Sequence, residues 1–214
     1  MMKFLSSPSA IPLLVVAMSV VPCHSQETNL DPVFYYLVKG QPIQRSISLG
    51  DPTNWSSSIQ GRSGKSAGGK ISIEPVSFKT KDDAIQITWA PKIEGQGNLG
   101  LYGKPIDLSR FKDLGALAID MRVDVKPTKT VNVGLDCGYP CRADLPINKL
   151  LKGMPKGEWF TLPIPLNCFK SDNFDPSKIN GAFTIATDGK FTVSITNIRL
   201  EKLDVGETGC AGKP

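Results

Sequence analysis

The residues best suited to chemistry in this sequence are a small set of aromatic and polar side chains. Tyr139 lies at the tip of a loop bounded by two cysteines, and Asp136 and Arg142 border that loop. Trp55 follows a turn-forming stretch, so we expect its ring to be partly exposed, and Tyr102 follows a glycine-rich turn. Exposed rings stack on the faces of sugar rings, while carboxylates and guanidinium groups bond to sugar hydroxyls. The candidate ligand-binding residues are therefore Trp55, Tyr102, Asp136, Tyr139 and Arg142.

The two other tryptophans are expected in the core. Trp89 ends an alternating stretch in phase with Ile85 and Ile87. Residues two apart on a strand share a face, so this phase predicts burial. Trp159 opens an expected strand and precedes Phe160, which favours the same interpretation.

Hydrolytic catalysis has little support in the sequence. Nucleophilic triads need a base, which is usually histidine, and the chain has a single histidine, His24, close to its N-terminus. Glycosidases need only two carboxylates, so a small glycosidase is the least favoured alternative rather than an impossible one. No pair is marked by an apolar surrounding, and no catalytic residue is predicted. The available carboxylates are Asp82, Asp83, Glu94, Asp136, Asp144 and Glu158.

The N-terminus has the pattern of a secretion signal. A basic residue, Lys3, precedes an apolar run from Ile11 to Val21 and then a small, polar stretch. This order is typical of a signal peptide, and the run is too short for a membrane helix, which needs about 20 apolar residues. We expect residues 1–25 to be removed, leaving a secreted or periplasmic protein with no membrane span. A lipoprotein anchored on Cys23 is the alternative, which Pro22 disfavours.

Four cysteines follow the signal: Cys137, Cys141, Cys168 and Cys210. An even number in an exported chain predicts two disulfides, and four cysteines allow three connectivities that the sequence does not distinguish. The turn-forming insert between the first two would let them close a tight loop, which would leave the other two as a pair. The spacing is not that of a zinc site. No cofactor is predicted. A structural Ca²⁺, which sugar-binding jelly rolls often hold, stays open as an alternative, although no cluster of aspartates marks a site for it.

Composition argues for one β-rich domain. The 20 glycines and 17 prolines fall between short apolar runs, as in all-β proteins. After removal of Lys3 with the signal, 24 basic and 20 acidic residues remain, and their scattered placement argues against nucleic-acid binding. Residues 56–69 are expected to be a mobile loop and residues 147–154 the single helix. Strands are expected at residues 33–37, 45–49, 70–74, 76–79, 84–89, 99–102, 116–125, 129–136, 158–165, 181–187 and 190–203, the last with a bulge near Asn197.

About ten short strands and one short helix predict an all-β fold, a two-sheet antiparallel jelly-roll sandwich. The expected organisation is a signal peptide at 1–25, an N-terminal lead-in at 26–42, the sandwich at 43–205 and a C-terminal tail at 206–214.

Several stretches resemble a known family. The match covers roughly residues 43–203, and the Cys-Gly-Tyr-Pro-Cys loop with the later Leu-Asn-Cys-Phe stretch is fairly specific. The stretches are residues 84–89, 107–109, 116–123, 133–141, 150–159, 164–169 and 183–189. Together they are similar to the galactose-binding-like C-terminal domain of ExoP-type glycoside hydrolase family 3 β-glucosidases and exo-β-glucanases.

The resemblance implies a galactose-binding-like jelly roll that assists β-glucan or other glycan processing in Gram-negative bacteria. In those enzymes the catalytic residues lie in upstream domains, whereas here a signal pattern directly precedes the expected domain. The favoured function is therefore a secreted, non-catalytic carbohydrate-binding accessory module whose partner is an oligo- or polysaccharide such as β-glucan. The alternative is a structural or protein-interaction domain that associates with a separate glycoside hydrolase.

Overall fold

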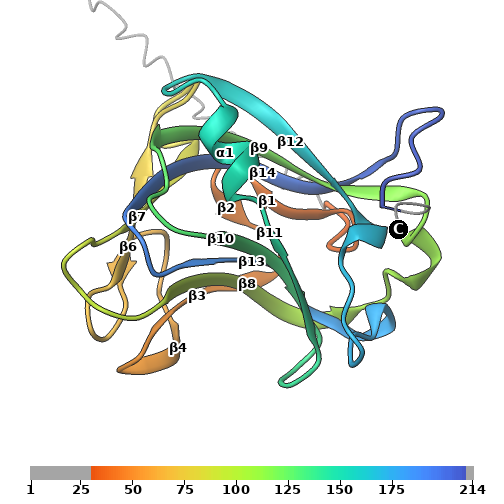
Figure 1. Cartoon of the computed structure of the whole chain (residues 1–214), viewed down its shortest axis with the longest axis horizontal. Helices are drawn as coiled ribbons and strands as arrows, with labels where there is room; N and C mark the ends of the chain where they lie inside the picture. The colour runs from red at the N-terminus through yellow and green to blue at the C-terminus, as the bar shows by residue number, and fades with distance from the viewer. Residues whose placement is uncertain (1–29, 211–214) are drawn as a thin grey trace, which may run out of the picture.

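Two antiparallel β-sheets packed face to face form the protein, as a computed structural model describing residues 30–210 shows (Figure 1). This confirms the predicted all-β sandwich with one short helix. The expected signal peptide, with Cys23 and His24, and the last four residues lie outside the described range. Within residues 30–210, no helix is long and apolar enough to cross a membrane.

The larger sheet contains eight strands. Its main path runs β12-β9-β14-β7-β6-β5, and the short strands β1 and β2 are added because β1 pairs with the far end of β14. Its strands are β1 (Tyr35–Val38), β2 (Gln41–Pro42), β5 (Gly64–Lys65), β6 (Ile71–Val76), β7 (Ala84–Trp89), β9 (Gly115–Val125), β12 (Trp159–Pro165) and β14 (Phe191–Lys202).

The smaller sheet contains six strands in the order β11-β10-β13-β8-β3-β4. Its inner face packs on the larger sheet, and its outer face is the one that concerns function. Its strands are β3 (Arg45–Asp51), β4 (Asn54–Ser58), β8 (Gly97–Ile106), β10 (Val131–Asp136), β11 (Arg142–Pro146) and β13 (Ile179–Thr187).

Most expected elements form close to their predicted places. The helix α1 spans Asn148–Gly153, and the register of β14 shifts between Ile195 and Asn197, where a bulge was expected. The prediction of a loop at 56–69 was wrong, because part of β4, which pairs with β3, and all of β5, which pairs with β6, lie within it. No separate strand forms at 76–79. Strand β11 was missed because it is short and carries only two apolar core-side residues, Ala143 and Leu145.

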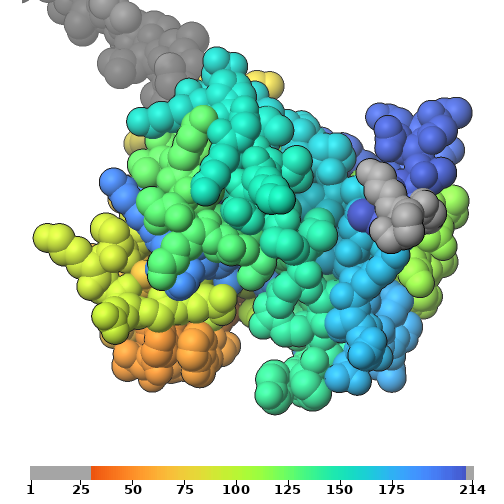
Figure 2. Space-filling view, viewed as in Figure 1, coloured from red at the N-terminus to blue at the C-terminus, as the bar shows by residue number. Residues whose placement is uncertain are grey.

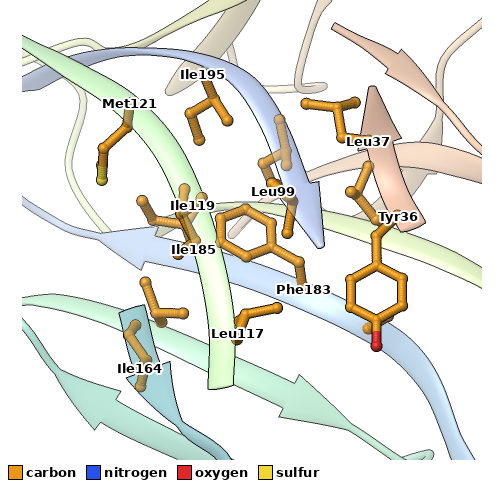
Figure 3. Packing of buried hydrophobic residues seen from close by; sticks show 14 of the residues in the cluster. Tyr36, Leu37, Leu99, Leu117, Ile119, Met121, Ile164, Phe183, Ile185 and Ile195 are labelled. Carbon is orange, nitrogen blue, oxygen red and sulfur yellow. The ribbon is translucent and has the colours of Figure 1, made fainter. Parts of the chain in front are cut away.

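The core lies between the inner faces of the sheets. Phe183 of β13 is fully buried, and Figure 3 shows it close to Leu117 and Ile119 of β9 in the opposite sheet. Burying a large aliphatic or aromatic side chain contributes about 1.5–3 kcal/mol. Tyr36 and Leu37 of β1 also have no exposed surface, so the lead-in before residue 43 contributes to this core.

Two disulfides join segments at the surface. Cys137 pairs with Cys141 and closes the β10–β11 turn, while Cys168 pairs with Cys210 and ties the C-terminal segment to the residues after β12. The structure thus selects one of the three connectivities that the sequence left open.

Asp83 organises the loop that joins β6 to β7. It is buried, and its carboxylate accepts hydrogen bonds from the backbone N–H groups of Phe78, Lys79 and Thr80 at 2.6–3.0 Å. Burial acts to raise the pKa of this carboxyl, but the N–H donors outweigh it and hold the pKa at about 2. The ionised form is therefore favoured in the folded protein.

This shift predicts a contribution to stability that depends on pH. Because the pKa of Asp83 is lower in the folded than in the unfolded chain, the contribution is complete above about pH 4 and is lost as pH falls toward 2. Thermal melts between pH 2 and 7 should show D83N less stable than the wild type at neutral pH, with the difference shrinking in acid. D82N, a neighbour in the same loop, serves as control. A gap between D83N and wild type that stayed constant down to pH 2 would contradict the assignment.

Candidate functional site

A cleft on the outer face of the smaller sheet contains every predicted ligand-binding residue. Its volume is about 450 Å³, within the range of about 300–1,000 Å³ usual for small-ligand sites. Three further side chains, those of Gln96, Asn98 and Thr184, complete the lining. The five predicted members are Trp55, Tyr102, Asp136, Tyr139 and Arg142.

Strand alternation explains why these side chains face outward. In β8, Leu99 and Leu101 are buried in the core, so Asn98 and Tyr102 must point to the opposite face. In β13, Thr184 lies between two core residues and points outward for the same reason. The cleft and the hydrophobic core therefore lie on opposite faces of the smaller sheet.

Glycines form the floor beneath Tyr102. A β-carbon on Gly100, in the same strand, would collide with the edge of the tyrosine ring, and one on Gly181 of β13 would lie 2.8 Å from its Cε1. The ring therefore lies across the backbone of two neighbouring strands, in space that only glycine leaves open. Gly134 of β10 is similar, because a β-carbon there would meet the hydroxyl of Thr184 at 2.7 Å. These glycines keep the floor of the cleft free of β-carbons.

The polar groups of the cleft are electrostatically coupled. Asp136 and Arg142 face each other across the β10–β11 pair, and the hydroxyl of Tyr102 donates to Asp136 Oδ2 at 3.4 Å. Burial, reinforced by the Asp136 charge, raises the pKa of Tyr102 to about 12. Burial acts to lower the pKa of Arg142, but the hydrogen bond from its Nη2 to Asp144 (2.7 Å) and the nearby carboxylates outweigh this and raise it. Both groups remain protonated donors at neutral pH.

Arg142 has a buried donor that no protein group within residues 30–210 satisfies. Its Nε is buried and has no partner among the described residues, although its Nη2 is paired with Asp144. A buried donor without a partner is costly unless a ligand or water satisfies it. This group is therefore available to a ligand that supplies an acceptor.

Two exposed aromatic residues stand at opposite sides of the cleft. Trp55 is 57% exposed and belongs to the edge strand β4, while Tyr139 is 95% exposed at the tip of the β10–β11 hairpin. Figure 2 shows a hollow between the orange surface that contains β4 and the green-blue surface that contains the β10–β11 hairpin. The hairpin is tightly closed, because Cys137 N donates to Cys141 O and Cys141 N to Gly138 O, each at 2.8 Å.

The other two tryptophans lie outside the cleft. Trp89 is fully buried, as predicted, and its Nε1 donates to Gly97 O at 2.9 Å. The prediction that Trp159 belongs to the core was wrong. It lies opposite Arg122 on the outer face of the larger sheet, where its ring packs on Phe78 with centroids 4.2 Å apart. Its neighbour Phe160 points to the core side. The prediction placed the alternation of this strand one residue out of phase, and so assigned Trp159 to the wrong face of the sheet.

Sequence reasoning missed three lining residues. Asn98 and Thr184 could have been found from their alternation with core residues, since Asn98 is in phase with Tyr102. Gln96 lies in a glycine-rich loop without periodicity, and no sequence signal places it in the cleft. Within the described part of the chain, no group of three or more His, Cys, Asp or Glu residues is arranged to hold a metal ion.

Comparison with known proteins places this architecture in context. A family profile described as Exop_C, galactose-binding domain-like, matches residues 45–200. No curated protein matches the sequence.

Two similar solved structures come from the exo-1,3/1,4-β-glucanase (ExoP) of a Pseudoalteromonas species. Its isolated extra C-terminal domain X is 21% identical, with a TM-score of 0.65 over 78% of this chain and 91% of that one. The full enzyme is 22% identical, with a TM-score of 0.66 over 85% of this chain, which spans only 22% of the enzyme. A family 30 carbohydrate-binding module from a cellulosomal cellulase of Clostridium thermocellum is 16% identical, with a TM-score of 0.55 over 80% of this chain and 98% of that one. At these identities the similarity establishes the fold.

The glycine floor predicts how Tyr102 responds to a small change beneath it. Gly100→Ala should lift the ring off the sheet, so the pKa of Tyr102 should fall from about 12 toward 10. Spectrophotometric titration measures this pKa when the wild type and Gly100→Ala are each compared with the same chain carrying Tyr102→Phe, because the difference isolates the absorbance of Tyr102. Circular dichroism monitors folding. Gly153→Ala is the matched control, because a β-carbon there meets nothing within 4 Å. A midpoint still near 12 in Gly100→Ala would show that the ring does not rest on this glycine.

Proposed function

This chain belongs to the Exop_C family of galactose-binding-like domains, and on that basis we propose that it is a non-catalytic carbohydrate-binding module. The observation that carries the proposal is the cleft itself. It combines two exposed aromatic residues, a third ring held against the floor, and a set of amide, hydroxyl, carboxylate and guanidinium groups. Rings that stack on pyranose faces and polar groups that bond to hydroxyls are what a sugar site requires.

The charges in the cleft favour a neutral glycan. Arg142 is balanced by Asp144, with which it forms an ion pair, and by Asp136 across the strand pair. A polyanionic sugar chain would meet these carboxylates without a surplus of cations to offset them. Gln96, Asn98 and Thr184 add neutral groups that donate and accept hydrogen bonds, as hydroxyl-rich ligands need.

We further propose β-glucan as the glycan. Two observations support this choice: the similar domain X is part of an exo-1,3/1,4-β-glucanase, and the similar family 30 module is part of a cellulase. An open cleft about 450 Å³ in volume, crossing the sheet from β4 to β11, suits a segment of an extended chain.

Isothermal titration with laminarin, cello-oligosaccharides and galactans tests this function. The wild type should bind a glucan more tightly than a galactan. Trp55→Ala, Tyr102→Ala and Tyr139→Ala should each weaken binding about tenfold, equivalent to about 1.4 kcal/mol, through loss of a stacking surface.

Trp159→Ala is the matched control, since it removes a half-buried ring from the other sheet and should leave glycan affinity unchanged. Flat titrations with every glycan would exclude a carbohydrate-binding module. Unchanged affinity in all three cleft variants would show that the binding site lies outside this cleft.

We also propose that the protein acts in a secreted or periplasmic compartment. The signal pattern before residue 26 and the two disulfides support this location, because disulfides persist in oxidising compartments. N-terminal sequencing of the exported protein should find Gln26 as the first residue. A mature chain that retained residues 1–25 would contradict the expected cleavage.

A second candidate function, association with a separate glycoside hydrolase, is favoured by an apolar hollow on another surface. Phe34, Phe111 and Leu200 line it, and Leu114 is 62% exposed beside them. Exposed apolar surface of this kind is a feature of protein interfaces. If this function operates, a co-produced family 3 hydrolase should co-purify with the wild type and not with Leu114→Asp, while the cleft variants should co-purify normally.

A further inference from the structure

Lys70 is a buried lysine whose ammonium is bound entirely by backbone carbonyl groups. The residue has no exposed surface, and its Nζ donates to Ala90 O at 3.0 Å, Ile93 O at 2.6 Å and Asp188 O at 2.9 Å. An ammonium has three N–H donors, so these carbonyls use all of them. Three oxygens converging on one positive centre resemble the ligand set of a bound cation, with the cation here supplied by the chain itself.

A fully buried lysine is rare and needs a structural reason. Burial lowers the pKa of Lys70, because removing the ammonium from water disfavours its charged form. Three short hydrogen bonds to carbonyl dipoles offset that cost. The nearest side-chain charges that face it are those of Asp188 and Lys129, which pair with each other at 2.9 Å.

The ammonium joins three segments that are distant in sequence. Lys70 directly precedes β6, residues 90–93 begin the β7–β8 loop, and Asp188 lies in the β13–β14 turn. Ala90 N also donates to Lys70 O at 2.8 Å, which holds the loop from the other side. The lysine is therefore the common contact of this end of the sandwich.

A buried carboxylate extends the connection to β4. Asp51 has no exposed surface, and its Oδ2 accepts from Gly68 N at 2.7 Å and from Lys70 N at 3.4 Å. Its Oδ1 accepts from Thr53 N at 3.0 Å and from Asn54 N at 3.4 Å. Asp51 thus ties the segment before β6 to the turn that leads into Trp55.

The β7–β8 loop also reaches the cleft directly. A β-carbon on Gly95 would collide with Pro52, so this loop packs closely on the β3–β4 turn. The next residue, Gln96, lines the cleft together with Trp55. Trp55 and Gln96 thus form one wall of the cleft. The position of this wall depends on the loop that the Lys70 ammonium holds.

From these contacts we infer that Lys70 is a positioning residue, whose ammonium acts as a built-in cation that fixes the Trp55 and Gln96 wall of the cleft. The effect on glycan affinity rests on the proposed function. The effect on the wall itself does not, and it can be measured without any glycan.

Lys70→Met tests the inference, since it retains a long side chain and removes all three donors. Amide hydrogen exchange of the variant should accelerate about tenfold or more in residues 52–58, 90–97 and 188–190, and remain unchanged in β9 and β12. Affinity for whichever glucan the wild type binds should fall roughly tenfold. Lys129→Met is the matched control, because it removes a neighbouring, exposed ammonium that contacts only the Asp188 side chain. It should change neither readout.

Lys70→Ala supplies a second test that remains informative if the methionine variant folds poorly. n-Propylammonium replaces the deleted atoms, so millimolar amounts should raise the melting temperature of this variant and slow exchange at 90–97. Tetramethylammonium, which has no N–H donors, and sodium at equal ionic strength should not. Rescue by Ca²⁺ without rescue by propylammonium would overturn the assignment to N–H donors.

The outcomes separate the two proposals. If the wild type binds no glycan, the proposed function fails, and the exchange and rescue measurements still decide the role of Lys70. Unchanged exchange at residues 52–58 and 90–97 in Lys70→Met would overturn the positioning role. So would accelerated exchange there with full glycan affinity, because the wall would then be free to move without consequence for binding.

Discussion

Contact between the inner faces of the two sheets determines which strand residues face the cleft. A strand that places Leu99 and Leu101 in the core must place Asn98 and Tyr102 on the other side of the sheet, because successive side chains alternate. Truncating a core residue such as Phe183 would leave a cavity at a cost of about 3–5 kcal/mol. The same burial that stabilises the sandwich therefore holds the candidate binding face in register.

The outer face of the smaller sheet lacks side chains at three positions near the cleft. Gly100, Gly134 and Gly181 occupy positions where a β-carbon would collide with a side chain that lines or borders the cleft. Glycine in a strand interior weakens it, because it loses more conformational freedom and offers no side chain to pack. This cost is offset where the Tyr102 ring covers two of the glycines and presents an aromatic surface in a fixed orientation.

Buried charges stabilise the irregular segments around the two sheets. Asp83 caps the β6–β7 loop, Asp51 holds the β3–β4 turn, and Lys70 gathers three segments at one end of the sandwich. Each is fully engaged by backbone groups, as buried ionised side chains must be. Regular strands satisfy their own backbone, so these charges are concentrated where the backbone leaves the sheets.

The period-two alternation of apolar residues determined by itself the fold class, most strands and the burial of Trp89. The stop signals Gly153 and Pro155 marked the end of the helix expected at 147–154, which forms at 148–153. Local chemistry likewise marked Trp55 and Tyr139 as exposed. Tertiary structure decided the rest, because pairing between distant strands leaves no local pattern. It brought Trp55 of β4 and Arg142 of β11 to opposite sides of one cleft, selected the disulfide pairing and reversed the face of Trp159. It also gave Lys70, one lysine among many in the sequence, three carbonyl partners from segments 20 to 118 residues away.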